Sequence, residues 1–314
     1  VAHSQAMNTH SLSRRRILTL AAAGLAFPLG GLPLAATPRP IAMCPIPSTG
    51  EAIPVLGKGT WITFNVGSSS RLRDERVKVL QAFFDHGGRM VDSSPMYGSA
   101  EDVMGYCLKQ VRDPSPLFSA TKIWTSSDAE GVVQMQASER LWGESQFDLQ
   151  QVHNLLNWEF HLARLKEWKV SGRIRYLGIT TSHGRRHSDF ADVMQAEPLD
   201  FVQLTYNILD REMEDRLLPL AADRGQAVIV NRPFKRDGLF QSFGHHPLPE
   251  WAREFGARNW AQFFLKFVLS HPAVTCAIPA TSQVGHMEEN MAAARGPMPD
   301  AAMRRRMIDY VERL

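Results

Sequence analysis

Short apolar runs alternate with amphipathic, helix-length segments over most of this chain. Eight runs have the length and composition of strands, and they cover residues 55–61, 90–94, 117–122, 149–155, 176–181, 201–207, 227–233 and 276–281. Between the runs apolar positions recur at helical spacing, as at Val77, Leu80 and Phe84, which puts one apolar stripe on a helix face. Eight strand–helix repeats without an internal linker predict an α/β fold, a (β/α)8 TIM barrel.

Local signals refine this barrel. Residues 46–54 place turn residues between apolar flanks, which predicts an N-terminal β-hairpin ahead of the first barrel strand. Ser127 with Glu130 has capping-box spacing, and Pro299-Asp300 opens a final helix. A doubly wound sheet is the competing fold. It would favour a glycine-rich dinucleotide fingerprint after the first strand, and residues 57–61 lack its third glycine.

The first 36 residues have a different character from the rest. Arg14, Arg15 and Arg16 precede an apolar run at 18–34 that Gly and Pro interrupt, and small residues follow. This order predicts a signal peptide at 1–36, and the paired arginines resemble a twin-arginine export signal. We therefore expect the Tat export machinery as a partner, a periplasmic or exported location, no permanent membrane span, and a single barrel domain over 37–314. An uncleaved anchor or a basic tail is the alternative.

Composition narrows the possible partners. Without the leader, Lys+Arg falls from 35 to 32 against 32 Asp+Glu, so the formal net charge falls from +3 to 0. Because the chain after the leader has no net charge, it shows no basic patch of the kind that binds nucleic acid, and we expect no nucleic-acid partner. The scattered cysteines Cys44, Cys107 and Cys276 are typical of buried small side chains rather than of a disulfide framework.

Four polar residues that suit proton transfer follow consecutive strands. Asp92, Lys122 and His153 stand at the C-terminal ends of the second, third and fourth runs, and Tyr97 lies in the loop after the second. Barrel enzymes hold their chemistry at this end of the strands. A free phenol titrates near about 10, and a nearby ammonium favours its ionisation. Lys122 can therefore activate Tyr97, Asp92 can hold Lys122 charged, and His153 can hydrogen-bond a carbonyl oxygen. Each residue also has an ordinary structural interpretation, but their joint placement favours catalysis.

Six motifs in one order carry a resemblance to a known family. They occupy residues 91–98 with Glu101, 121–124, 151–154, 172–180, 202–207 and 278–290. Over residues 46–290 the chain resembles the aldo-keto reductases, here as an exported bacterial member. The resemblance implies reduction of an aldehyde or ketone to an alcohol by hydride transfer from NAD(P)H. It assigns catalysis to Asp92, Tyr97, Lys122 and His153, with Tyr97 as the general acid.

The resemblance also implies where the cofactor binds. The nicotinamide carboxamide is expected to bind polar groups after the fifth strand and on the sixth strand. The aromatic residue that commonly stacks on the nicotinamide is replaced here by Asn231-Arg232. Ala280 and His286 stand where many relatives carry cations for the adenosine 2′-phosphate. We expect NADP, with NAD as the alternative. Cofactor contacts are predicted at Thr181, Ser182, Gln203, Asn231, Arg232, Thr281, Ser282, His286 and Asn290.

Trp61, Trp124 and Trp158 follow the first, third and fourth strands and are predicted to wall an apolar pocket for a small-molecule carbonyl substrate. Two other functions stay open. The altered cofactor positions and the export signal suit a nucleotide-binding barrel that acts as a redox sensor or binding protein with little turnover. A metal-dependent hydrolase would use Asp92 and His153, but His-x-His spacing is absent near them, so no metal is expected.

Overall fold

The eight apolar runs form the eight strands of one parallel sheet. The computed structural model describes residues 40–314, which include all of these strands. In chain order the strands are β3 (Lys58–Gly59), β4 (Met90–Asp92), β5 (Phe118–Ile123), β6 (Phe147–Val152), β7 (Ile174–Thr180), β8 (Phe201–Thr205), β9 (Ala227–Asn231) and β10 (Cys276–Ala277). Each strand pairs in parallel with the next one in sequence, so the predicted (β/α)8 order is confirmed.

The two ends of the sheet meet at a seam between β3 and β10. Isolated parallel bridges join Leu56 to Ala277 and Gly59 to Ala280, and the backbone N–H of Gly57 donates to the carbonyl of Ala277 at 2.8 Å. A Cβ on Gly59 would lie 2.9 Å from the carbonyl oxygen of Ile278. The glycines before Trp61 therefore allow the backbones to approach closely at the seam, which is a different use from phosphate binding.

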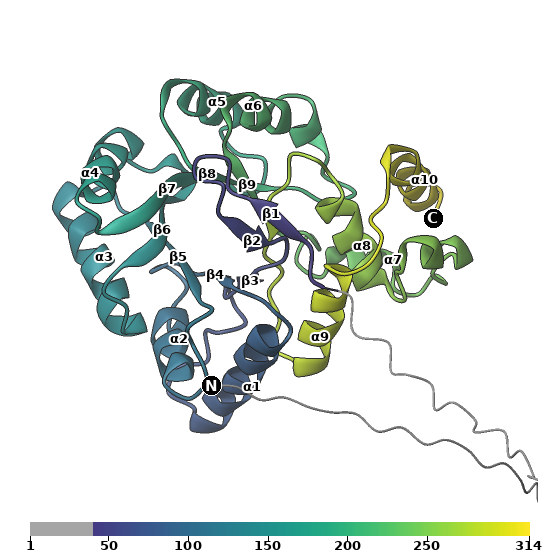
Figure 1. Cartoon of the computed structure of the whole chain (residues 1–314), viewed down its shortest axis with the longest axis horizontal. Coiled ribbons are helices and arrows are strands. Elements are labelled where there is room, and N and C mark those ends of the chain that lie inside the picture. Colours follow the sequence, from purple (N-terminus) through teal and green to yellow (C-terminus); the bar gives the residue numbers. More distant parts are fainter. Residues whose placement is uncertain (1–39) are drawn as a thin grey trace, which may run out of the picture. The chain divides into compact units, whose positions relative to one another are not determined.

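Helices surround the strands, as Figure 1 shows. They are α1 (Ser70–Asp85), α2 (Ala100–Leu108), α3 (Asp128–Trp142), α4 (Trp158–Val170), α5 (His187–Ala196), α6 (Leu217–Arg224), α7 (Gly238–Phe243), α8 (Trp260–Leu269), α9 (Val284–Ala293) and α10 (Ala301–Glu312), with short 3-10 turns η1 (His153–Leu155), η2 (Glu212–Glu214) and η3 (Glu250–Phe255). Both predicted helix starts appear, and the side chains of Ser127 and Asp300 accept hydrogen bonds from the backbone N–H groups of Glu130 and Met303. The return bond of a capping box does not form, because Ser127 N donates to Thr125 Oγ1.

An N-terminal hairpin closes one end of the barrel. Strands β1 (Met43–Pro45) and β2 (Ala52–Pro54) pair antiparallel, as the sequence predicts, and Figure 1 shows them across the centre of the ring. Ile46 and Ile53 are fully buried in an inner cluster with Met90 and Phe118, the first residues of β4 and β5. The hairpin therefore plugs the N-terminal end of the strands, and the C-terminal end stays available for chemistry.

One strand end differs from the expected pattern. The fourth run was expected to continue to residue 155, but β6 ends at Val152 and His153 begins the turn η1. Asn154 and Leu155 have φ values of 53° and 54°, in the left-handed region, so the chain leaves the sheet there. His153 still lies at the C-terminal end of its strand, now on a turn that directs the chain toward α4.

The predicted leader at 1–36 lies outside the described residues. Within residues 40–314, none of the helices is long and apolar enough to cross a bilayer. The described residues, 40–314, form one compact unit.

Candidate active site

The barrel interior changes from apolar to polar along the strands. Side chains two residues apart on a strand share a face. The inner cluster at the strand starts holds Met90, Leu149 and Phe201, and two residues further along the same strands stand Asp92, Gln151 and Gln203, all buried. The chain therefore builds an apolar floor and a polar layer above it, at the end where barrel active sites lie.

Asp92 and Lys122 form the centre of this layer. Lys122 Nζ donates to Asp92 Oδ1 at 2.5 Å and to the backbone carbonyl of Ser93 at 2.6 Å. Burial alone would lower the pKa of Lys122, but Asp92 and then Tyr97 oppose it, and the pKa is raised above its ordinary value. Lys122 is therefore an ammonium at neutral pH. Both charged groups are shielded from solvent, with side-chain exposures of 0% for Lys122 and 3% for Asp92.

The second carboxylate oxygen of Asp92 is held by two amides. Gln151 Nε2 donates to Asp92 Oδ2 at 2.9 Å and Gln203 Nε2 donates to the same oxygen at 3.1 Å. Gln203 Nε2 also lies 3.2 Å from Gln151 Oε1. The amides fix the orientation of the carboxylate toward Lys122. They also tie Gln203, a predicted cofactor contact, to the proton-transfer group.

Tyr97 lies over the ammonium, on the loop between β4 and α2. Lys122 Nζ is 5.1 Å from the centre of its ring. The loop turns at Gly98 with φ of 61°, and a Cβ there would lie 2.4 Å from Asn65 Oδ1, so this turn requires glycine. Burial raises the pKa of Tyr97, and the opposing effect of Lys122 does not overcome it. The phenol is therefore protonated at rest, and the expected lowering of its pKa by Lys122 is only partial.

His153 is a neutral hydrogen-bonding group beside Tyr97. The two rings meet edge to face with centres 6.4 Å apart. Burial first, and then Lys122, lowers the pKa of His153 to about 3. Its Nδ1 lies 2.9 Å from Thr180 Oγ1, which accepts the backbone N–H of Asn154 at 3.1 Å. The Thr180 hydroxyl can then donate to Nδ1, which leaves the imidazole hydrogen on Nε2 for a substrate oxygen.

The predicted nicotinamide contacts meet at the ends of β7, β8 and β9. Asn231 Nδ2 donates to the carbonyl of Thr181 at 3.0 Å and lies 3.4 Å from Gln203 Oε1. The Thr181 hydroxyl donates to the carbonyl of Arg185 at 2.6 Å, so it holds its own loop. Ser182 Oγ donates to Asn154 Oδ1 at 3.3 Å. These four residues are brought together, and Gln203 and Asn231 present amides there.

The predicted phosphate-side contacts lie apart from that group, after β10. Thr281 and Asn290 are buried and Ser282 is half-buried, whereas His286 is exposed on α9. Two cations reach this loop from the outer side of the barrel. Lys58 Nζ donates to the carbonyl of Thr281 at 3.4 Å, and Arg76 donates to the carbonyl of Ser282 at 3.4 Å. Burial lowers the pKa of Lys58 to about 7.

The three tryptophans lie in different surroundings. The ring of Trp61 lies 6.5 Å from the ring of Tyr97, so Trp61 borders the proton donor. Trp124 is 40% exposed after β5, and both amide atoms of Gln134 bond its backbone. Trp158 begins α4 and packs against the hydrophobic core. Trp61 alone among the three has a ring contact with a catalytic candidate in the described part of the chain.

Three site residues were missed from the sequence. Gln151 and Thr180 contact Asp92 and His153 directly, and Ser93 provides the carbonyl that binds Lys122. Gln151 left a readable signal, because it is a polar residue two positions after Leu149 and strand alternation puts both on the inner face. Thr180 and the carbonyl of Ser93 depend on which strands are neighbours, which only the folded barrel reveals.

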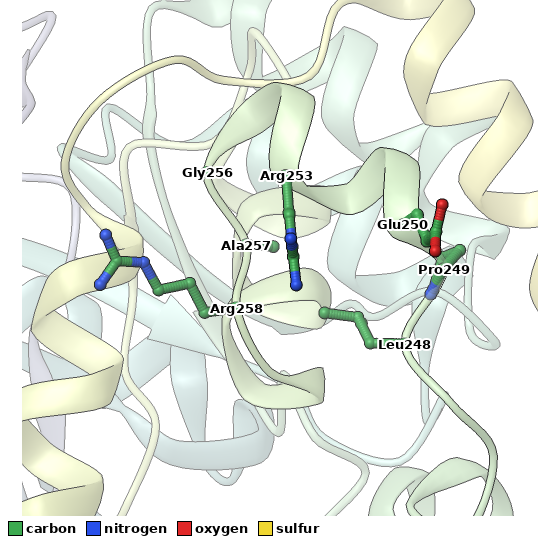
Figure 2. Close-up of a pocket in the computed structure, with 7 residues that line it drawn as sticks. All are labelled: Leu248, Pro249, Glu250, Arg253, Gly256, Ala257 and Arg258. Carbon is green, nitrogen blue, oxygen red and sulfur yellow. The ribbon is translucent and has the colours of Figure 1, made fainter.

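A metal site and a second hollow are the two alternatives to the mouth of the barrel. Among residues 40–314 no group of three or more His, Cys, Asp or Glu is placed to hold a metal ion. A hollow of about 580 Å³ lies around η3. Figure 2 shows the residues that line it, Arg253 and Arg258 among them. None of its lining residues comes from a barrel strand end, so we do not place the reaction there despite its size.

Comparison with known proteins agrees with this geometry. A family model described as the aldo/keto reductase family matches residues 55–307. The chain is 27% identical over 193 residues to the aldo-keto reductase YhdN of Bacillus subtilis, a match that spans 57% of each protein. It is 24% identical over 245 residues to the NADH-specific methylglyoxal reductase of Escherichia coli, covering 67% of this chain and 72% of that protein.

A solved structure extends the likeness to the fold. The crystal structure of an aldo/keto reductase from Klebsiella pneumoniae in complex with NADP and acetate superposes with a TM-score of 0.70. The sequence identity is 22%, and the match covers 83% of this chain and 93% of that one. With the family model spanning most of the barrel, the chain belongs to the aldo/keto reductase family.

Proposed function

We propose that this protein reduces an aldehyde or ketone to an alcohol by hydride transfer from NAD(P)H, with Tyr97 as the general acid. The observation that carries the proposal is the joint placement of a buried Asp92–Lys122 pair, the Tyr97 ring 5.1 Å from Lys122 Nζ, and a neutral His153. Membership of the family supports the same reaction class. These groups suit proton delivery to a developing alkoxide.

The chain's own residues supply the proton, and a bound reduced nicotinamide supplies the hydride. Tyr97 enters the reaction protonated because burial raises its pKa. As negative charge develops on the substrate oxygen, Tyr97 passes its phenolic proton to that oxygen, and the adjacent Lys122 ammonium stabilises the phenolate left behind. His153 donates a hydrogen bond to the same oxygen and orients it. Asp92 keeps Lys122 charged throughout.

The residues present suit a nicotinamide nucleotide. We place the carboxamide beside the side-chain amides of Gln203 and Asn231, which contact each other at the ends of β8 and β9, and the guanidinium of Arg232 suits a diphosphate. We propose NADP(H) as the cofactor and NAD(H) as the alternative, since Ala280 and His286 provide no strong cation for a 2′-phosphate. The Klebsiella pneumoniae neighbour is a complex with NADP, and the Escherichia coli relative is named NADH-specific.

A turnover assay tests the reaction directly. The purified full chain is incubated with NADPH or NADH and a panel of small aldehydes and ketones, and oxidation of the nucleotide is followed by its absorbance. We expect aldehyde-dependent oxidation and formation of the alcohol. Tight nucleotide binding without turnover on any carbonyl would favour the sensor or binding-protein alternative, and absence of binding would sink both functions.

We also propose that residues 1–36 direct export by the twin-arginine route, so that the barrel works in the periplasm. Arg14, Arg15 and Arg16 before an interrupted apolar run support this. That route carries folded protein, so a bound nucleotide could travel with it. Replacing the three arginines by lysine keeps the charge. We expect this variant to vanish from the periplasmic fraction of cells, and unchanged export would refute the proposal.

A further inference from the structure

Three arginines gather around His183 at the mouth of the barrel. Arg185 lies with His183 on the loop after β7, and Arg232 and Arg236 lie on the loop after β9; we call the three arginines the mouth cations. The guanidinium of Arg232 contacts the imidazole of His183. Burial lowers the pKa of His183 first, and Arg232, Arg185 and Arg236 lower it further. The pKa of Arg232 is also lowered, by burial and by Arg236 against the opposing effect of Asp210, so the charges of Arg232 and Arg236 repel each other.

The mouth cations form no ion pair with an acidic side chain inside the described part of the chain, and the charge of Asp210 acts on Arg232 only from beyond ion-pair distance. Neighbouring cations on the same loop are neutralised, since Arg186 pairs with Asp189 at 2.9 Å and His187 with Glu212 at 3.0 Å. By contrast, none of Arg185, Arg232 and Arg236 forms an ion pair with an Asp or Glu within residues 40–314. Repelling charges held together without a counter-charge are stabilised by a bound anion.

The backbone at these positions adopts unusual conformations. His183, Arg232 and Arg236 have φ values of 61°, 52° and 62°, in the left-handed region that non-glycine residues rarely adopt. Such conformations are strained for residues other than glycine and tend to cluster at functional sites. The loops after β7 and β9 thus hold cations toward one another against both charge repulsion and backbone preference.

Arg236 links this cluster to the reacting groups. Its guanidinium stacks on the ring of Trp61, with 4.5 Å between the guanidinium carbon and the ring centre. The same Trp61 ring lies 6.5 Å from the ring of Tyr97. A carbonyl compound that packs on Trp61 with its oxygen at Tyr97 and His153 would therefore carry its far end toward Arg236. This separation suits an anionic group several bonds away from the carbonyl.

We infer that Arg236 forms a subsite for an anionic carbonyl substrate, as the main contact for a carboxylate remote from the aldehyde or ketone, while Arg232 keeps its proposed place at the cofactor's diphosphate. The inference rests on the proposed function and names its substrate class. A guanidinium binds a carboxylate through two parallel hydrogen bonds, and stacking on Trp61 keeps the planar fork in one orientation. Half-aldehydes of dicarboxylic acids and aromatic aldehydes with a distal carboxylate fit this description.

The test compares two aldehydes of the same shape. Terephthalaldehydic acid carries a distal carboxylate, and its primary amide replaces that group by a neutral one. For the wild-type full chain we expect kcat/KM to be about tenfold or more higher for the acid, an ordinary effect for a charge-assisted bidentate contact. The difference should lie mainly in KM and should shrink as salt is added.

Variants assign the effect to the subsite. Arg236→Gln should lower the acid-to-amide ratio of kcat/KM to about one, whereas Arg258→Gln, a matched change in the remote hollow of Figure 2, should leave the ratio as in wild type. Equal kcat/KM for acid and amide in the wild type overturns the inference and leaves the reductase function intact. Turnover of neither aldehyde overturns both.

The cofactor's diphosphate is the competing anion, and a second measurement separates it. Nucleotide affinity is measured by quenching of protein fluorescence on titration with NADPH. We expect Arg236→Gln to change the Kd for NADPH by less than about twofold while the acid-to-amide ratio collapses, since the contact is with substrate. A Kd raised about tenfold with an unchanged ratio would show that the mouth cations serve the cofactor and would overturn the inference.

Discussion

At the scale of single residues, the site depends on which protonation states the barrel imposes. Asp92 and two amides hold Lys122 as an ammonium, while burial keeps Tyr97 protonated and His153 neutral. The same Lys122 therefore acts in two directions, stabilising a phenolate at Tyr97 and opposing a proton on His153. A positive charge at the centre of the site sets both roles.

The charge state of His153 predicts a pH profile. Its pKa is about 3 in the folded protein against an ordinary value of 6.5, so the neutral form persists as pH falls through 6.5. Because the unfolded state binds a proton on His153 first, the stability associated with the neutral form is full above 6.5 and is lost progressively as pH falls from 6.5 to about 3. We expect kcat/KM to show no acidic limb near 6.5 that belongs to His153. A limb there that disappears in His153→Gln would contradict the assignment.

The hydrogen bond from Gln151 to Asp92 predicts that Gln151 positions the Asp92 carboxylate. Its Nε2 donates to Asp92 Oδ2 at 2.9 Å, a hydrogen bond to a charged acceptor of about 1.5–3 kcal/mol. Gln151→Leu should therefore reduce kcat by roughly tenfold. Gln151→Glu should be worse, because a second carboxylate beside Asp92 destabilises the ionised pair. Steady-state kinetics of the two variants check this, and equal activity of Gln151→Leu and wild type would remove Gln151 from the site.

At the scale of elements, the hairpin stabilises one end of the barrel and the C-terminal strand ends carry the polar groups at the other. The hairpin β1–β2 buries Ile46 and Ile53 at the start of the strands, whereas the loops after β4, β7 and β9 carry the polar groups. Stability and chemistry are thus assigned to opposite ends. A change in the floor should affect folding more than turnover.

Ile53→Ala tests this division. Ile53 is fully buried, and truncation of such a residue costs about 2–5 kcal/mol of unfolding free energy. We expect a clear fall in Tm by calorimetry and an unchanged kcat well below that Tm. Met43→Ala, in the same hairpin but 46% exposed, is the matched control and should change Tm little. A loss of kcat in folded Ile53→Ala would show that floor and mouth are coupled.

The sequence predicted the elements well because strand alternation and helix caps are local signals. The eight runs, the hairpin and the helix starts at Ser127 and Asp300 all appear in the structure. Strand ends were less predictable, as His153 illustrates, because the turn at Asn154 depends on a hydrogen bond to Thr180 from the neighbouring strand. Such contacts join distant parts of the chain, and no local pattern encodes them.

At the scale of the whole molecule, one mouth collects residues from most of the barrel. Asp92, Tyr97, Lys122 and His153 come from three consecutive strands and their loops, and could be named from the sequence. The mouth cations could not, because Arg236 meets Trp61 only once the loop after β9 reaches the first strand of the barrel. Isolated bridges between the two ends of the sheet, at Leu56–Ala277 and Gly59–Ala280, close the ring around which these loops lie.

The central claim, that Tyr97 donates the proton to the reduced carbonyl, is tested most directly by Tyr97→Phe. Tyr106→Phe is the matched control, since Tyr106 lies on α2 and its hydroxyl bonds Asp74 at 2.6 Å, away from the mouth. The measurement is kcat with a saturating aldehyde, alongside the Kd for NADPH. We expect kcat to fall about 10²–10⁴-fold in Tyr97→Phe with nucleotide binding retained, and to stay as in wild type in Tyr106→Phe. Unchanged kcat in Tyr97→Phe would contradict the account.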